Sequence, residues 1–195
     1  MAAKKFYWAA LLGLIIILGF LLFQRPADFI DDSASYRASG HNSTCPITKK
    51  IYTVRGESMS PLLREGQDIT GLLGYYACHK VERGDIILYE LPGKENFIVK
   101  KVVGIPGDSF AVQEGGISLN WNIIINGSLL GNSAGAAYTL DEQHHKILSL
   151  YERDYAGEIP GGAYILFGDA LSGSLDSTQF GFAQKSRIMG KVEPQ

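Results

Sequence analysis

The stretch Gly56-Glu57-Ser58-Met59-Ser60-Pro61 organises this chain of 195 residues. It follows Lys50-Ile51-Tyr52-Thr53-Val54, where apolar and polar side chains alternate as they do in a strand. Ser60 and Pro61 suit the N-cap and first position of a helix, so we expect a short helical turn over Pro61 to Arg64. The strand would thus deliver Ser58 to a tight bend.

A serine hydroxyl is a poor nucleophile at neutral pH and needs a neighbouring base to accept its proton. The histidines lie in segments typical of linker or loop: His41, His79, His144 and His145. The strongest candidates are Lys100 and Lys101, in the otherwise apolar stretch 97–103. Adjacent strand residues point to opposite faces, so the lysine that faces inward lies among aliphatic side chains, where desolvation lowers its pKa. Alternation alone leaves the choice between the two open.

Three stretches resemble, in the same order, the motifs of type I signal peptidases. Residues 56–61 resemble the serine box, Lys100 to Asp108 the lysine box, and Gly168 to Gly181 the C-terminal box. Together they account for most of residues 50–192. The resemblance implies a mainly β, signal-peptidase-like antiparallel domain and a Ser/Lys serine peptidase without a cofactor or metal.

The resemblance also implies roles for single residues. Ser58 would be the nucleophile, Lys100 the base, Ser174 a hydroxyl that orients the lysine amine, and Asp176 the acidic position of the third box. The Ser58 backbone N–H would meet the oxyanion. Substrate would enter extended and pair with the strands before Ser58 and Lys100. The substrate-binding candidates are Glu57, Met59 and Val99.

Three positions depart from the family pattern. Gly56 stands where the family often has a hydroxyl donor, Ala170 where it usually has asparagine, and Thr178 where arginine is expected. The pattern Ser174-Leu175-Asp176 followed by Phe180-Gly181 is similar to the conjugative-transfer branch, the TraF-like pilin peptidases. That resemblance implies a pilin precursor as substrate, pilus or secretion machinery as a partner, and a cyclic product in place of a hydrolysed one.

Phe6 to Phe23 form an apolar run without charge, about the length of a transmembrane helix. Lys4 and Lys5 precede the run and three aspartates follow it, which predicts a cytoplasmic N-terminus. We therefore expect a cytoplasmic tail (1–5), a single span of the bacterial inner membrane (6–23), a linker (24–46) and an extracytoplasmic catalytic domain (47–195). The alternative is a cleaved secretion signal.

Within the catalytic domain, residues 109–162 are expected to form a variable insertion, a small β lobe with a hairpin at Asn126-Gly127. The pair His144-His145 is expected in a solvated loop and not at a metal. Further strands are expected at 86–89, 163–167 and 188–192. No helical pattern long enough for an α/β sandwich follows the anchor.

Composition and charge argue against a nucleic-acid-binding protein and for a β-rich one. The chain is 46% hydrophobic with a net charge of -2, which does not suggest a nucleic-acid surface, and its 23 glycines suit a turn-rich β fold. Cys45 and Cys78 lie on the exported side, where a disulfide can persist; two unpaired thiols are the alternative.

The leading hypothesis is a membrane-anchored serine endopeptidase that cleaves signal or leader peptides from exported proteins, with a pilin precursor as the narrower possibility. A bitopic scaffold of a secretion or pilus complex, inactive but similarly folded, is the alternative. A self-cleaving repressor of the LexA-like type shares the Ser/Lys pair, but the apolar N-terminal run argues against it.

Overall fold

The computed structural model describes residues 45–93, 96–115 and 120–195. The expected cytoplasmic tail, membrane span and nearly all of the linker lie outside these residues. Across the described ranges, no helix combines the length and the apolar character that a membrane crossing requires.

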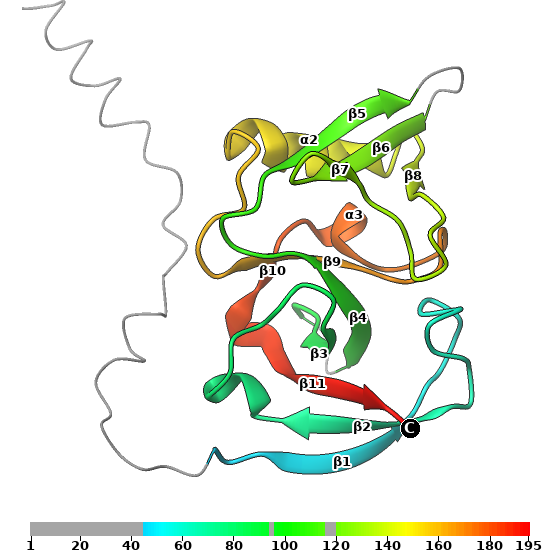
Figure 1. The fold of residues 1–195 in the computed structure, drawn as a ribbon, viewed down its shortest axis with the longest axis vertical. Coiled ribbons are helices and arrows are strands. Elements are labelled where there is room, and N and C mark those ends of the chain that lie inside the picture. Colours follow the sequence, from blue (N-terminus) through cyan, green and yellow to red (C-terminus); the bar gives the residue numbers. More distant parts are fainter. Residues whose placement is uncertain (1–44, 94–95, 116–119) are drawn as a thin grey trace, which may run out of the picture.

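A seven-stranded antiparallel sheet forms the lower part of the molecule (Figure 1). Its strand order is β1-β2-β11-β3-β4-β9-β10. The strands are β1 (Thr48–Thr53), β2 (Asp68–Leu73), β3 (Ile86–Glu90), β4 (Phe97–Gly104), β9 (Ala163–Phe167), β10 (Ala183–Gln184) and β11 (Ile188–Pro194). Short 3-10 turns, η2 (Tyr75–Ala77) and η3 (Lys185–Arg187), precede β3 and β11. The mainly β antiparallel class and the strands expected near 86–89, 163–167 and 188–192 are therefore confirmed.

The central strands are buried on both faces. Ile87 and Val102 belong to one apolar cluster, whereas Met59, Leu63 and Leu88 belong to another. Because strand neighbours alternate between faces, β3 contributes to both clusters and reads as a continuous apolar run. This double burial fixes β3 and its partner β4 rigidly in the middle of the sheet.

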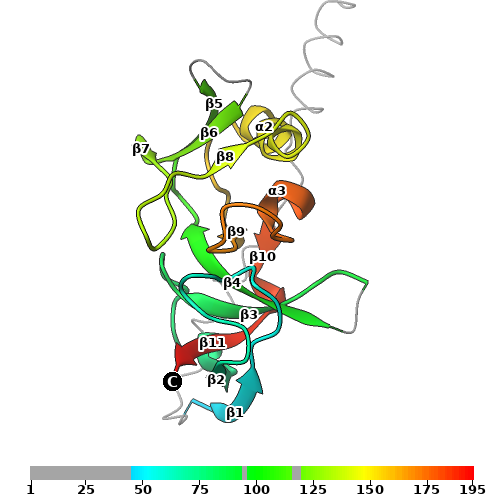
Figure 2. The same cartoon turned by 90° about the vertical axis from the view of Figure 1, so that its right-hand side faces the viewer.

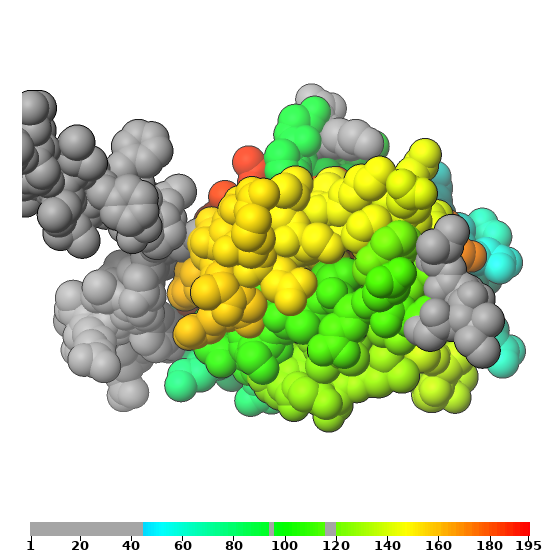
Figure 3. Space-filling model, turned by 90° about the horizontal axis from the view of Figure 1, so that it is seen from above, coloured from blue at the N-terminus to red at the C-terminus, as the bar shows by residue number. Residues whose placement is uncertain are grey.

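Residues 109–115 and 120–162 form the upper lobe, which has its own four-stranded sheet (Figure 1 and Figure 2). Its strands are β5 (Phe110–Gly115), β6 (Asn120–Ile125), β7 (Ser128–Leu129) and β8 (Thr139–Leu140). The expected hairpin turn is present, with Asn126 and Gly127 both at positive φ. Seen from above, this lobe and its helix α2 make up most of the visible surface of the described residues (Figure 3).

The sequence-based expectation of a loop around His144-His145 is wrong, because helix α2 (His145–Asp154) begins there. His144 occupies its N-cap position. The ring of His145 stacks on the ring of Trp121, with the ring centroids 3.6 Å apart. Leu148 is fully buried in the lobe's core, and Tyr151 packs against the same core. Leu148 and Tyr151 are three residues apart, the spacing of one helix face, so the helical signal was present but short.

The helical turn expected over Pro61–Arg64 is also absent. The chain makes an irregular turn in which the Ser60–Pro61 peptide is cis and the Leu63 N–H donates to the Met59 carbonyl at 2.8 Å. Met59 and Leu63 are buried in the core beneath the turn. Tertiary burial of these two side chains, rather than helix propensity, shapes the segment.

Candidate active site

Ser58 lies on a bend held from both sides. The Val54 N–H donates to the Gln67 carbonyl and the Ser60 N–H to the Glu57 carbonyl. Gly56 has φ 76°, a left-handed conformation that glycine adopts without the clash that a Cβ brings. Met59, only 2% exposed, anchors the bend in the core. The local structure therefore presents Ser58 between a strand end and a buried side chain.

Lys100 lies in the middle of β4, directly opposite Ile87 of β3. It is only 2% exposed. Its Nζ lies 2.9 Å from Ser58 Oγ and also donates to the Val99 carbonyl at 2.9 Å. The two side chains, 42 positions apart in the sequence, are thus within hydrogen-bond distance of each other.

The environment of Lys100 favours its neutral form. Burial lowers the pKa of Lys100 to about 8, although the nearby charge of Asp176 acts in the opposite direction. An amine with a pKa of about 8 is neutral in about a tenth of the molecules at pH 7, against roughly one in a few thousand for an ordinary lysine, and only the neutral amine can act as a general base. The pair can therefore transfer the hydroxyl proton without a histidine.

Asp176 organises the third box. Its carboxylate accepts the Thr178 N–H and hydroxyl at 3.1 and 2.8 Å, and the Gly168 N–H at 3.3 Å. It caps the short helix α3 (Ser177–Phe180). Ser174 Oγ is buried, and the described residues offer it no hydrogen-bond partner. The hydrogen bond expected between Ser174 and the lysine amine is therefore not formed here.

Lys101 points to a different set of groups. Its Nζ lies 3.0 Å from Asp169 Oδ1, and Asp169 also accepts the backbone N–H and hydroxyl of Ser133 from the upper lobe. Burial alone would raise the pKa of Asp169, but hydrogen bonds from Ser133 and Lys101 hold it below its usual range. The adjacent Ala170 N–H donates to the Ser58 carbonyl at 3.1 Å. This ion pair therefore fixes a loop that contacts Ser58.

Sequence reasoning missed Asp169 and Ser133 as parts of the site. The signal for Asp169 was available, because a second lysine in an apolar strand needs an anionic partner when its face is buried. Ser133 lies in a loop of the lobe, and nothing in its sequence context indicates that it approaches the third box. Only the folded chain brings them together.

A groove of about 680 Å³ runs beside Ser58 and Lys100. It is lined by residues 51–55 at the end of β1 and 96–100 at the start of β4, together with Met59 and Ile69. Within the described sheets β1 pairs only with β2, and residues 97–100 of β4 pair only with β3. Both strands thus present a free edge here. Met59 and Val99 line the groove, whereas Glu57 is exposed and is not part of its lining.

Cys45 and Cys78 are joined by a disulfide, with their Cα atoms 5.9 Å apart. The bridge ties the first described residue to the segment after η2, away from the groove lining. In the part of the chain that the structure describes, no cluster of three or more His, Cys, Asp or Glu side chains is arranged to hold a metal ion.

Comparison with known proteins gives a consistent family. The model of the family described as "Signal peptidase, peptidase S26" matches residues 44–194. Signal peptidase IB of Staphylococcus aureus (strain COL) is 26% identical over 148 residues, which cover 72% of this chain and 74% of that protein. Signal peptidase I of Bacillus caldolyticus is 31% identical over 145 residues, which cover 73% of this chain and 76% of that protein.

A crystal structure of a signal peptidase I from Enterococcus faecalis V583 aligns over 58% of this chain and 97% of that chain, with 25% identity and a TM-score of 0.41. The family-model match spans the strand edges, the Ser58–Lys100 pair and the third box. The chain therefore belongs to the signal peptidase family, peptidase S26, and is a serine peptidase of the type I signal peptidase kind.

Proposed function

We propose that this protein is a membrane-anchored endopeptidase that cleaves signal or leader peptides from exported proteins, with Ser58 as nucleophile and Lys100 as general base. The observation that carries the proposal is the 2.9 Å separation of Lys100 Nζ and Ser58 Oγ at the side of an open groove. Family membership supports the reaction class. The buried amine supports the role of Lys100 because its pKa is lowered to about 8.

The proposed chemistry uses one proton and one acyl group. Neutral Lys100 accepts the Ser58 proton as Oγ attacks the scissile carbonyl, and the resulting ammonium then protonates the leaving amine. Water hydrolyses the acyl-enzyme with Lys100 again as the base. The Ser58 backbone N–H stabilises the oxyanion. Gly56 lacks a hydroxyl, so a second donor has to be a backbone group or water.

We assign substrate binding to the two free strand edges. An extended peptide between β1 and β4 would pair its backbone with both and fill the gap in the sheet, which is β-augmentation. Met59 and Val99 line the groove where side chains of the substrate would lie. Glu57 stays a weaker candidate, because it lies outside the lining.

We propose that residues 6–23 anchor the protein in the bacterial inner membrane, with the N-terminus in the cytoplasm and the catalytic domain outside. The uncharged apolar run and the lysines before it support this topology. Reporter fusions at residue 3 and at the C-terminus test the topology. A protein recovered without its first residues from the extracytoplasmic fraction would point instead to a cleaved secretion signal.

The decisive test of the dyad is cleavage of a preprotein by three forms of the full chain: wild type, Ser58→Ala and Lys100→Met. We expect each substitution to lower cleavage by at least about a thousandfold, as losses of nucleophile or base do. Thermal unfolding should stay cooperative in both variants. Processing that survives in Ser58→Ala would contradict the dyad and favour the inactive scaffold.

We further propose a pilin precursor of conjugative transfer as the natural substrate. The departures at Ala170 and Thr178 support this narrower assignment, and Thr178 donates to Asp176 where an arginine is expected. Mass spectrometry of the product from a co-expressed candidate pilin distinguishes two fates of the acyl-enzyme. A chain lighter by one water indicates cyclisation, whereas the linear mass indicates hydrolysis.

A further inference from the structure

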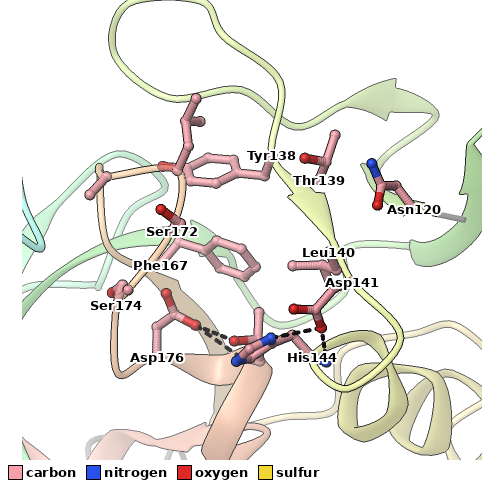
Figure 4. Close-up of a pocket in the computed structure, with 14 residues that line it drawn as sticks. Asn120, Tyr138, Thr139, Leu140, Asp141, His144, Phe167, Ser172, Ser174 and Asp176 are labelled. Atoms are coloured by element: carbon pink, nitrogen blue, oxygen red, sulfur yellow. Dashed lines mark hydrogen bonds and ion pairs between the residues drawn. The ribbon is translucent and has the colours of Figure 1, made fainter. Parts of the chain in front are cut away.

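A second hollow lies on the other side of the loop that contacts Ser58. It encloses about 290 Å³ between residues 170–174 and the upper lobe (Figure 4), and we call it the lobe pocket. The lobe contributes Leu140, Asp141 and His144, and the lower sheet's loop contributes Leu171, Ser174 and Asp176. The lobe pocket is thus formed jointly by the insertion and the third box.

One wall of the lobe pocket contacts the active site through Ala170. Ala170 lines the pocket, and its N–H donates to the Ser58 carbonyl at 3.1 Å. The substrate groove and the lobe pocket share no lining residue. Suppose that the substrate residues upstream of the scissile bond occupy the groove between β1 and β4. The substrate residues that follow the scissile bond then pass Ser58 and reach the loop 168–171, and the lobe pocket lies behind this loop.

The polar groups of the lobe pocket suit a cationic side chain. Asp141 supplies an exposed carboxylate at the wall formed by the lobe, and Asp176 supplies a buried one. The ring of His144 lies 2.8 Å from Asp141. The described lining holds no lysine or arginine. Ser174, 6% exposed, adds a buried hydroxyl without a partner in the described chain.

We propose that the lobe pocket binds the first residues on the carboxyl side of the scissile bond and prefers a basic side chain there. This inference rests on the proposed peptidase function. It assigns the insertion a role in substrate selection, since Leu140, Asp141 and His144 all belong to residues 109–162. Asp141 is the specificity-determining residue at the pocket's exposed side.

The test compares peptides that share one upstream sequence. Lys, Gln and Asp are placed in turn at positions one to four after the cut, and kcat/KM is measured with the full-length protein in detergent. At one position we expect kcat/KM for the Lys peptide to exceed that for the Asp peptide by about two- to fivefold, the range of a partly exposed ion pair.

Two matched variants separate the pocket from general charge. Asp141→Asn keeps the side-chain oxygen that accepts the Gln143 and His144 N–H groups, so the start of α2 is retained. Asp141→Asn should bring the ratio of kcat/KM for the Lys peptide to kcat/KM for the Asp peptide close to one. Glu142→Gln removes a charge from the next residue, which is not part of the lining, and should leave the ratio unchanged.

Three outcomes would overturn the inference. Equal cleavage of all downstream variants refutes it while leaving the peptidase assignment intact. An equal loss of preference in Asp141→Asn and Glu142→Gln refutes the pocket as its origin. If correctly folded wild-type protein cleaves none of the peptides and no preprotein, the proposed function and the inference fall together.

Discussion

The adjacent lysines Lys100 and Lys101 have different surroundings in this protein. Lys100 is buried beside an alcohol, and no carboxylate contacts its amine within the described residues, so its pKa falls. Lys101 is ion-paired with Asp169, a fully buried carboxylate. The charged form of a lysine is stabilised by an anion and destabilised by burial without one. At the residue scale, the partner thus decides which lysine can act as a base.

Activity should increase with pH through the pKa of Lys100. Because only the neutral amine accepts the Ser58 proton, kcat/KM should rise tenfold per pH unit well below about 8 and level off above it. The measurement is a pH profile from 6 to 10 on a substrate without ionisable side chains. A flat profile, or one that falls between pH 7 and 9, would contradict lysine as the base.

Lys101→Met should lower activity by loosening the loop that carries Asp169, and not by changing the proton transfer from Ser58 to Lys100. It leaves the buried Asp169 carboxylate without its cation, and we expect a loss of about 3 kcal/mol in unfolding free energy. Cleavage should fall less than in Lys100→Met, and the midpoint of the pH profile of kcat/KM should be the same as in wild type. Lys101→Arg, which keeps the charge, should recover most of the stability. A shifted midpoint in Lys101→Met would show that it affects the base directly.

At the scale of elements, the loop after β9 joins Ser58, Lys101 and the upper lobe. Gly168 donates to Asp176 and accepts the Tyr138 hydroxyl at 2.6 Å. A Cβ on Gly168 would overlap Ser174 Oγ and the Ser58 carbonyl oxygen. Since one of these is backbone, the overlap cannot be relieved by turning a side chain. Glycine is therefore required here by close approach.

Gly168→Ala should separate the loop from Ser58 and lower kcat by at least about tenfold, because small displacements of a reacting group are costly. Gly104→Ala is the matched control. Its added Cβ would crowd the Ile159 side chain on the lobe side, away from the nucleophile. Both variants should lose stability in thermal unfolding, but only Gly168→Ala should lose kcat. Equal kcat values would contradict a positioning role for the loop.

At the scale of the whole molecule, the disulfide links the first described residue, Cys45, to the turn that follows η2. Removing it with Cys45→Ser and Cys78→Ser opens a loop of 33 residues. The loop-entropy relation gives a loss of about 3 to 4 kcal/mol in unfolding free energy. Urea unfolding measures this change. Reductant should destabilise wild type by a similar amount and leave the double variant unchanged; insensitivity of wild type to reductant would contradict the bridge.

The amino-acid sequence by itself determined the mainly β class, the main strands and the family. Periodicity and turn residues act locally, so 86–89, 163–167 and the Asn126-Gly127 hairpin could be read directly. The short elements were harder to predict from the sequence. Helix α2 depends on burial of Leu148 against residues distant in the sequence, and the segment after Ser60 follows the burial of Met59 and Leu63.

Only the tertiary structure decided which lysine meets Ser58, because strand alternation is symmetric between Lys100 and Lys101 until neighbouring strands define an inside. It also decided that Asp169 and Ser133 lie beside the site and that residues of the upper lobe line a second pocket next to it. These contacts join residues far apart in sequence through the sheet order, and side-chain patterns along one strand carry no information about them.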